Sequence, residues 1–256
     1  MNNISIDIKE LCRYTNEEYI SLIQIGYVYC QKILTFIPRV DSLKDYPSHG
    51  IDHSVRIIEY INKFITSFEV ELSEEEIYLL YLAAWCHDIG CICGRDNHHK
   101  DSVKVLRKST GFFNEILDDK TKKCLKSIIL THRKDTPFDD IPELYEGIKL
   151  KFLCAIFRLM DACDISSERC PRIVYEYIKE SLNDTSKKYW KAHLNIASVS
   201  FYDKSIWIDL FEGNEALEYI KKEFVSEIMS ISQIFSENGI VLSIKISLDE
   251  KEIILD

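Results

Sequence analysis

The sequence predicts a mainly α-helical protein that ends in a small α+β subdomain of β-β-α-β order. Apolar residues recur every three or four positions through most of the first 190 residues, which is the spacing of a buried helix face. From about residue 195 the pattern changes to short β-rich runs separated by turn residues. Hydrophobic residues make up 46% of the 256 residues, which is enough for a sizeable core. We therefore expect a helical domain at 1–190 and a small α+β subdomain at 191–256.

Charge and cysteine usage indicate an intracellular protein. The formal net charge of −10 argues against duplex nucleic acid or an anionic membrane as the main partner. Nine cysteines without a CxxC pair suit a reducing cytoplasm better than a disulfide framework. The first residues, MNNISID, lack the pattern of a signal peptide, and no apolar run approaches membrane-spanning length. We expect a soluble cytoplasmic protein.

The first part of the chain predicts two long helices. Residues 8–38 have helical spacing and stop at Pro38. A turn-rich stretch follows, and Ser48 or Asp52 caps the second helix. The apolar stripe of this helix consists of Ile51, Val55, Ile58, Ile61, Ile65 and Phe68. His53 lies in its first turns, where an inward-facing side chain would reach a neighbouring helix.

A third helix ends in an adjacent histidine and aspartate. Ser73 and Glu76 have the spacing of a capping box, an apolar run follows, and Gly90 stops the helix. His87 and Asp88 fall at the end of the apolar stripe, so both can project from the buried side. A buried carboxylate is costly unless a partner neutralises it, and a divalent metal ion does so. The alternative is a purely structural His-Asp pair at a helix end, in which the two side chains satisfy each other's polar groups.

A fourth helix follows after a short turn that contains cysteines. Asp96 or Asn97 is its expected cap, and His99 shares its apolar face, whereas His98 points more sideways. The helical face therefore favours His99 over His98 as the inward-facing residue. The nearby cysteines do not have the spacing of a zinc knuckle, so we expect small buried hydrophobes at Cys86, Cys91 and Cys93.

Two more helices each carry a polar residue on an apolar stripe. The segment 120–132 ends its inward stripe with His132. A helix from about Leu144 carries Asp161 along its apolar face. A buried Asp161 demands a partner, and Arg158 one turn earlier is the ordinary structural candidate.

The C-terminal stretch predicts a hairpin, a helix and two further strands. They fall at 195–202, 205–211, 214–236, 240–247 and 253–254. From residue 195 on, the tail has no histidine and no recognisable chemical motif. We therefore expect a packing subdomain, or a surface for a protein partner or for self-association.

Six residues recur on the apolar sides of these helices, each near a helix end or a turn. They are His53, His87, Asp88, His99, His132 and Asp161. Separate pairs of hydrogen-bonded side chains, each satisfied on its own, do not readily explain why so many polar residues recur on apolar helix faces. A bundle that brings these residues to one point forms a nitrogen/oxygen metal site, with enough ligands for two ions and a bridging carboxylate. Such a site accepts Mn, Fe, Co, Ni or Zn.

The ordered set of His53, His87-Asp88 and Asp161 resembles the H…HD…D pattern of the HD-domain superfamily of metal-dependent phosphohydrolases. The sequences HSVRI, AAWCHDIG and LMDACDI also resemble their local context in that family, and the similarity covers about residues 45–170. The resemblance implies an all-helical HD-domain bundle in which these four residues bind one divalent metal ion.

Further segments resemble particular branches of the same superfamily. His99 in HHKDSV and His132 in LTHR are similar to the added histidines of binuclear HD enzymes. This similarity implies a second ion, with Asp88 as the bridge. The stretches RDNHHKDS and YWKAH and the β-rich tail resemble a bacterial HD subgroup that is sometimes fused to chaperone-type ATPase modules. The chain lacks the GYP motif, so cyclic-di-GMP is not supported as a substrate.

The resemblance implies hydrolysis of a phosphomonoester or phosphodiester in a small, nucleotide-like substrate. A metal-bound water would attack phosphorus, so Asp88 and its metals take the place of a side-chain nucleophile. His49 is a candidate proton donor to the leaving group, although a turn-stabilising role fits it equally well. Four basic residues flank the ligand segments and are candidate phosphate contacts: Arg95, Lys100, Arg133 and Arg169. The alternative for each of them is an ordinary solvated surface charge.

Two other functions fit the same residues. A metal-binding module without catalysis would sense a nucleotide and signal through the C-terminal tail. It would keep the ligands but turn over no phosphate ester. A diiron oxygenase of the HD type would instead require oxygen and show a mixed-valent iron signal.

Overall fold

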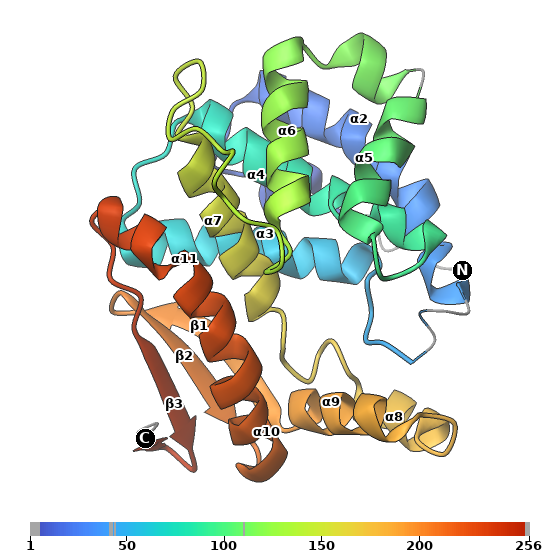
Figure 1. Cartoon of the computed structure of the whole chain (residues 1–256), viewed down its shortest axis with the longest axis vertical. Coiled ribbons are helices and arrows are strands. Elements are labelled where there is room, and N and C mark those ends of the chain that lie inside the picture. Colours follow the sequence, from blue (N-terminus) through green and yellow to red (C-terminus); the bar gives the residue numbers. More distant parts are fainter. Residues whose placement is uncertain (1–5, 41–42, 44, 110, 254–256) are drawn as a thin grey trace.

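The computed structural model describes residues 6–40, 43, 45–109 and 111–253. It confirms the predicted fold class, a mainly α-helical protein with a small C-terminal α+β part. The helices before the last third of the chain are α1 Ile8–Leu11, α2 Glu17–Leu34, α3 Ile51–Phe68, α4 Glu74–Cys86, α5 His98–Lys108, α6 Asp119–Thr131 and α7 Leu150–Cys163. Figure 1 shows α2 to α7 gathered into one bundle, with the sheet to one side of it.

The N-terminal segment contains two helices, whereas the sequence predicts one helix over 8–38. The side chain of Asn16 accepts a hydrogen bond from the Tyr19 backbone N–H at 3.0 Å and so caps α2. An asparagine in this position favours a new helix start over continuation of the preceding one. Pro38 lies in a short 3-10 turn, η1 at Ile37–Arg39. The prediction is therefore wrong between α1 and α2.

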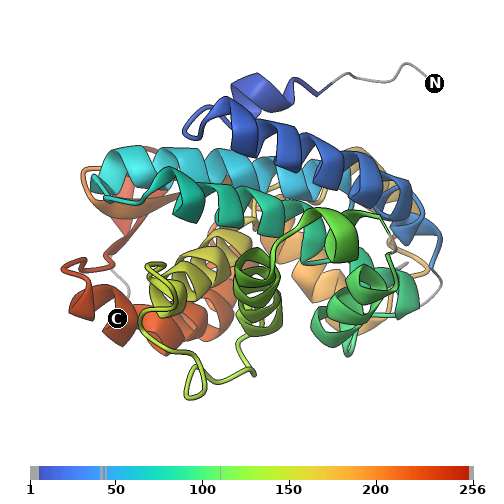
Figure 2. The same ribbon diagram turned by 90° about the horizontal axis from the view of Figure 1, so that it is seen from above.

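α4 is the central helix of the bundle. Ser73 and Glu76 form the predicted capping box at its start. The helix packs against α2, α3, α6 and α7, and from Glu76 onward its side chains are buried. Figure 2 shows α3 and α4 side by side. α4 ends at Cys86, before the predicted stop at Gly90, and a 3-10 turn, η3 at Ile89–Cys93, follows.

Two helix starts differ from expectation. Gly50 is the N-cap residue of α3, and no side chain of the described residues caps this helix. Ser48 donates instead to the Asp52 carboxylate, at 2.7 Å, so neither residue is the predicted cap. α7 begins at Leu150 rather than near Leu144, because the residues before it close a tight turn through an isolated antiparallel bridge.

Besides η3, the described residues contain further helical elements that the sequence does not predict. A π-helical turn, η4 at Phe112–Ile116, precedes α6. Helices α8 at Arg172–Ile178 and α9 at Asp184–Leu194 connect the bundle to the sheet. Tyr175 of α8 stacks on Trp190 of α9, with ring centroids 6.2 Å apart, so these helices have a small apolar cluster of their own.

The C-terminal elements follow the predicted β-β-α-β order. Their bounds are β1 Ile196–Tyr202, β2 Ser205–Leu210, α10 Asn214–Tyr219, a π-helical turn η5 Ile220–Phe224, α11 Val225–Glu237, β3 Ile244–Leu248 and β4 Lys251–Ile253. Asp203 and Lys204 both have positive φ, 48° and 52°, which is the geometry of a type I′ hairpin turn. The strand order is β1-β2-β3-β4, and only the β2–β3 pair is parallel. Residue 254 of the last predicted strand lies outside the described residues.

One apolar core extends from the bundle into the C-terminal part. Phe64 of α3 packs against Phe201 of β1 and Phe235 of α11, with ring centroids 5.7 and 5.9 Å apart. Phe152 of α7 also contacts Phe235, at 5.5 Å. α11 lies along α7, as Figure 1 shows. The predicted domain boundary after residue 190 falls inside α9 and stays a prediction.

Among the described residues, two segments are long and apolar enough to span a membrane, which corrects the expectation that no apolar run has that length. They are Glu17–Arg39 and Glu74–Cys93. The second is 89% buried and is the central helix of the bundle. The first lies near the N-terminus, is 28% buried and packs against α4. Core helices of soluble proteins pass the same criterion, so these segments are weak indications of a membrane span, and the cytoplasmic location stays a prediction.

Candidate metal centre

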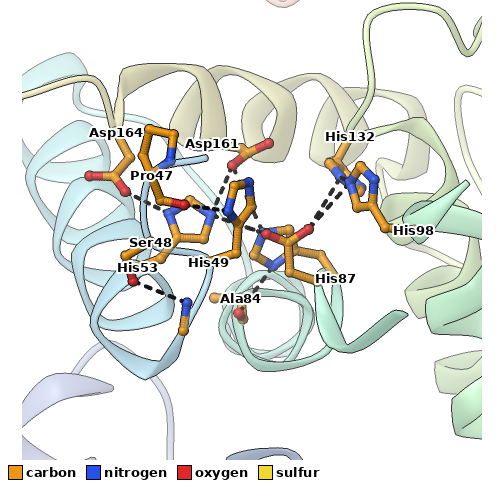
Figure 3. Close-up of polar contacts among 12 residues, drawn as sticks. Pro47, Ser48, His49, His53, Ala84, His87, His98, His132, Asp161 and Asp164 are labelled. Atoms are coloured by element: carbon orange, nitrogen blue, oxygen red, sulfur yellow. Dashed lines mark hydrogen bonds and ion pairs between the residues drawn. The ribbon is translucent and has the colours of Figure 1, made fainter. Parts of the chain in front are cut away.

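Six polar side chains converge where five helices begin or end. They come from the first turn of α3, the ends of α4 and α6, the start of α5 and the last turn of α7, and are His53, His87, Asp88, His98, His132 and Asp161. Figure 3 shows the four histidines and Asp161 turned toward one another. All are buried except Asp161, whose side chain is 24% exposed. Residues distant in sequence thus form one polar cluster inside an apolar bundle.

One half of the cluster consists of His53, His87 and Asp161. The Nε2 atoms of His53 and His87 lie 3.2 Å apart. Oδ1 of Asp161 lies 3.1 Å from Nε2 of His53 and 3.8 Å from Nε2 of His87. Three potential ligand atoms therefore face one point, within 4.8 Å of one another.

The other half consists of His98 and His132 with Asp88. The Nε2 atoms of the two histidines lie 2.8 Å apart. Asp88 Oδ1 lies 3.3 Å from Nε2 of His98 and 3.9 Å from Nε2 of His132. The second carboxylate oxygen, Asp88 Oδ2, lies 3.6 Å from His53 Nε2 and 3.4 Å from His87 Nε2. Asp88 therefore directs one oxygen to each histidine pair, which is the arrangement of a bridging carboxylate.

Each of the four imidazoles directs its Nδ1 atom to an oxygen. The pairs are His53 to Asp164 Oδ2 at 2.5 Å, His87 to Ala84 O at 3.1 Å, His98 to Arg95 O at 2.6 Å and His132 to Ile129 O at 2.7 Å. Carbonyl and carboxylate oxygens only accept hydrogen bonds, so in the neutral ring Nδ1 carries the proton and Nε2 a lone pair. The lone pairs within each histidine pair then repel unless a cation or a proton lies between them.

This donor set fits a divalent metal ion. Asp88 Oδ1 is buried and, within the described residues, receives no hydrogen bond, which is a costly state for a carboxylate oxygen. A bound cation would remove that cost together with the repulsion between the Nε2 lone pairs. Imidazole Nε2 atoms whose Nδ1 atoms are held by an acceptor are typical metal ligands. The mixture of imidazole and carboxylate suits Mn, Fe, Co, Ni or Zn.

The charge states also fit a cation. Burial raises the pKa of the Asp88 carboxyl, but the imidazoles of His87 and His98 outweigh burial and hold this pKa well below its usual range. Burial lowers the pKa of His98, and that of His132 to well below its ordinary value. An anionic carboxylate and neutral imidazoles are the forms that bind a metal ion.

His53 is held from behind by a buried ion pair. Arg56 donates to both oxygens of Asp164, at 2.7 and 3.0 Å, and Asp164 Oδ2 contacts His53 Nδ1. Burial lowers the pKa of His53, but Asp161 and Asp164 more than offset it and raise this pKa above its usual value. A proton on His53 Nε2, donated to Asp161, therefore competes with a metal ion at this position. Asp164 fixes the ring orientation, as partners behind a metal-binding histidine commonly do.

The structure places His98 in the cluster, whereas the helical face favours His99. α5 begins at His98, so the direction of this residue is set by the preceding turn, where Arg95 O holds Nδ1. Arg95 Nη1 lies 2.9 and 3.0 Å from the two ring nitrogens of His98, and this near equality places it over the ring face. His99 Nδ1 is buried and, among the described residues, has no hydrogen-bond partner. Burial lowers the pKa of His99 to about 4.

Gly90 permits the close contact that brings His98 to the cluster. A Cβ atom at this position would lie 2.2 Å from His98 O and from Ser102 N. The Ser102 hydroxyl accepts from the Gly90 N–H at 2.8 Å and donates to His87 O. The turn after α4 and the first turn of α5 are therefore locked together. Cys91 belongs to the same turn, and its sulfur lies within 4.8 Å of ligand atoms of Asp88 and His98, a nearness that its spacing does not predict.

A cavity of about 160 Å³ opens beside the cluster. Asp88, His132 and Asp161 contribute to its wall, and three arginines line it as well: Arg95, Arg158 and Arg169. Two of these, Arg95 and Arg169, are among the predicted phosphate contacts. The cavity therefore combines a potential cation site with fixed positive charges, which suits an anionic ligand.

Arg158 is not the partner of Asp161. Its Nε donates to Thr131 O at 2.8 Å and its Nη2 to Thr136 O at 2.6 Å. The structural alternative for a buried Asp161 is therefore wrong, because this carboxylate contacts His53 instead. Arg158 ties the end of α6 to α7 and leaves part of its guanidinium at the cavity wall.

Two predicted phosphate contacts do not line the cavity. The Lys100 side chain is exposed on α5. Arg133 donates to Asp96 O at 2.8 Å and to the Asp135 carboxylate at 3.1 Å. Neither side chain faces the cluster across this cavity, so the structure gives no support to their predicted role.

His49 lines the cavity, but both of its ring nitrogens already have hydrogen-bond partners in the protein. Its Nδ1 lies 2.6 Å from Pro47 O, and Arg169 donates to its Nε2 at 3.3 Å. Burial, with Arg95 and Arg169 nearby, lowers the pKa of His49 well below its usual value. A neutral imidazole in this arrangement orients the turn and the arginine and has no proton to give to a leaving group.

The C-terminal part contributes residues to the cavity that are not among the residues predicted for the site. Tyr219, Phe224 and Glu227 all line it. The one available signal was an acidic residue on the apolar face of helix 214–236, since Glu227 stands between the buried Phe224 and Ile228. The tail therefore does more than pack against the bundle.

A family model described as HD-CE matches residues 40–210, which include every member of the His/Asp cluster. A search of curated proteins returns no match for the chain. The resemblance to the HD-domain superfamily is thus confirmed. Because the matched region spans most of the bundle and the β1–β2 hairpin, the chain belongs to the HD-CE family, and its buried histidines and aspartates form the candidate metal site of an HD-type domain.

Proposed function

We propose that the protein is a metal-dependent phosphohydrolase that cleaves a phosphomonoester or phosphodiester of a small, nucleotide-like substrate. One observation carries the proposal: two facing histidine pairs share Asp88 at the wall of a cavity that three arginines also line. A structural His-Asp network would need neither the unpaired carboxylate oxygen nor the converging arginines.

The ligand set divides naturally between two ions. His53, His87 and Asp161 would hold one, His98 and His132 the other, and Asp88 would contact both. Bound ions of this kind lower the pKa of a coordinated water and neutralise charge on phosphoryl oxygens. Cys91 lies near the second position.

The arginines bind and orient the phosphoryl group. Burial lowers the pKa of Arg158 to about 10, so it stays protonated at neutral pH. Arg169 is held by Asp164 O at 2.9 Å and Ser48 O at 3.2 Å, which fixes its guanidinium at the cavity wall. Fixed guanidinium groups suit phosphoryl oxygens because their N–H donors match the oxygen geometry.

A neighbouring cavity suggests why the substrate is nucleotide-like. The metal-side cavity, about 160 Å³, is smaller than the ~300 Å³ or more that usually encloses a whole ligand. A second cavity of about 340 Å³ is lined largely by apolar groups, including Tyr46 and Trp190. His49 and Arg169 line both cavities. A phosphoryl group in the first cavity and a flat, partly apolar group in the second would use both.

The test is a hydrolysis screen on protein reconstituted with Mn, Fe, Co, Ni or Zn. Nucleotides, phosphomonoesters and phosphodiesters are incubated with wild-type protein and with Asp88→Asn. We expect turnover of at least one ester and a loss of about 100-fold or more in the variant. Binding without turnover of any ester would identify a sensor module instead. Oxygen consumption coupled to substrate oxidation would identify an oxygenase.

A further inference from the structure

Glu227 of α11 occupies the cavity wall supplied by the C-terminal part. Its Oε2 atom is buried and, within the part of the chain that the structure describes, has no hydrogen-bond partner. Asp88 Oδ1 is in the same state and lines the same cavity. A buried carboxyl oxygen without a partner is costly, so such an atom in a cavity indicates a ligand or a protonated group.

The charges that surround Glu227 do not neutralise it. Among the charged groups, Arg158 on α7 has the largest influence on this carboxyl, but three of its five N–H groups donate to Thr131 O, Thr136 O and the Ser230 hydroxyl. Lys134 favours the carboxylate form, whereas the acidic residues after α6 and on α7, Asp135 and Asp161, oppose it. Burial is the largest influence and raises the pKa of Glu227 to about 7. The carboxyl therefore retains its proton for a substantial fraction of the time near neutral pH.

We propose that Glu227 is the general acid of the hydrolysis, the residue that gives a proton to the leaving oxygen. This inference rests on the proposed phosphohydrolase function and deepens it. Glu227 lies outside residues 40–210, so it is not part of the region that the family model matches. It would make the C-terminal helix α11 a necessary part of the active site.

The proton and bond changes balance without any further reactant. The oxygen of a water molecule forms a bond to phosphorus and loses a proton. The bond between phosphorus and the leaving oxygen breaks, and that oxygen takes the proton of the Glu227 carboxyl. The released alcohol and phosphate leave, and the proton lost by the water restores the carboxyl.

His49 is the other cavity residue considered for this role. Its Nδ1 is directed to Pro47 O and its Nε2 accepts from Arg169, so neither nitrogen offers a proton to the cavity. Glu227 Oε2, by contrast, makes no hydrogen bond with any of the described residues. The comparison favours the carboxyl as the donor.

The experiment compares two esters of nearly equal shape, phenyl phosphate and p-nitrophenyl phosphate. Phenolate is a poor leaving group, with a pKa near that of tyrosine, about 10, and needs a proton, whereas p-nitrophenolate leaves readily without one. We expect Glu227→Gln to lower kcat/KM for phenyl phosphate by about 100-fold or more and to change that for p-nitrophenyl phosphate by less than about threefold. Glu223→Gln, an exposed glutamate one turn earlier, is the matched control and should change neither.

The pH profile gives a second readout. In wild-type protein kcat/KM for phenyl phosphate should fall above about pH 7 as Glu227 loses its proton, and this alkaline limb should disappear in Glu227→Gln. Infrared difference spectra provide a readout without turnover: a protonated-carboxyl band that titrates near pH 7 in wild type and is missing in the variant. Metal content and thermal unfolding verify that the variant is folded.

The outcomes separate the two proposals. If wild-type protein hydrolyses both esters and Glu227→Gln slows both equally or neither, the general-acid role is overturned and the phosphohydrolase stands. If wild-type protein hydrolyses no phosphate ester with any metal, the proposed function fails, and the role of Glu227 fails with it. A differential loss confined to phenyl phosphate supports both.

Discussion

Single hydrogen bonds decide the chemistry of the histidine cluster. The acceptors that face the four Nδ1 atoms fix each neutral ring in the tautomer that presents a lone pair on Nε2. Without a cation, those lone pairs and the unpaired oxygen of Asp88 raise the energy of the fold. A bound metal ion would therefore stabilise the protein through the same atoms that would take part in the proposed chemistry.

The neighbouring histidines of α5 allow a direct test of which one belongs to the cluster. His98→Ala should remove the second ion, because Nε2 of His98 faces both His132 and Asp88. His99→Ala should leave the metal content unchanged, because no contact of His99 with either aspartate of the cluster is among the interactions of the described residues. Elemental analysis of the two variants measures this, and equal losses would contradict the assignment.

The burial of His193, which is not a member of the His/Asp cluster, predicts that the stability of the fold depends on pH. This residue of α9 is buried beside Tyr219, and burial lowers its pKa to about 4. The unfolded chain, with a histidine pKa of about 6.5, therefore binds the proton more tightly than the folded chain. Stability is accordingly lost as the pH falls from about 6.5 to 4, by about 3 kcal/mol in total.

The measurement is the free energy of unfolding in urea at pH 7 and pH 4.5, in the presence of chelator. His193→Gln should lose less stability over this range than wild type, since glutamine does not titrate. A wild-type loss that the variant reproduces in full would show that other groups cause the acid sensitivity.

The sequence predicts most of the cluster, because each predicted member lies on the apolar side of a helix near one of its ends. These members are His53, His87, Asp88, His132 and Asp161. His98 is missed for a physical reason: the first residue of a helix is oriented by the preceding turn and not by the stripe. Glu227 is missed because the other residues that line its cavity lie on helices far away in sequence. Local spacing shows an acidic residue on an apolar helix face but not which residues it faces.

At the scale of elements, the η3 turn and the start of α5 must lie in backbone contact. Gly90→Ala would place a Cβ atom 2.2 Å from two backbone atoms of α5, so α5 has to move and take His98 with it. We expect destabilisation of roughly 2–4 kcal/mol and a loss of bound metal. Gly111→Ala is the control, because within 4 Å its Cβ meets nothing among the described residues.

Thermal unfolding and elemental analysis of both glycine variants check this prediction. A Gly90→Ala protein with wild-type stability and metal content would show that the contact is less close than described. Loss of stability in both variants to the same extent would point to a general effect of glycine replacement.

α3, which buries one clear stripe, and the capping box of α4 are predicted well. The missed boundaries have local causes. Asn16 starts a new helix within a segment whose apolar spacing continues, and a tight bridged turn delays α7 to Leu150. Periodicity alone does not detect such interruptions, because the apolar residues on both sides keep the helical spacing.

At the scale of the whole molecule, the C-terminal part and the bundle share one core. Phe235 of α11 is fully buried against Phe64 and Phe152. Phe235→Ala should cost about 3–5 kcal/mol and lower the stability of the entire chain in a single transition. Met229→Ala on the same helix, where the side chain is 71% exposed, should change stability by less than about 0.5 kcal/mol.

Calorimetric unfolding shows whether the C-terminal part shares a core with the bundle or folds as an independent unit. One transition that shifts as a whole in Phe235→Ala fits a shared core. Two transitions, with only one displaced by the substitution, would show that residues 191–256 fold as an independent unit.

The metal centre is best tested by the metal content of protein purified without chelator, measured by elemental analysis for wild type and Asp88→Ala. We predict close to two transition-metal ions per wild-type chain and loss of metal in the variant, because Asp88 directs an oxygen to each histidine pair. One ion per chain would restrict the site to a single histidine pair. Wild-type protein that binds no metal, even after reconstitution with Mn, Fe, Co, Ni and Zn, would contradict the metal centre and the phosphohydrolase proposal together.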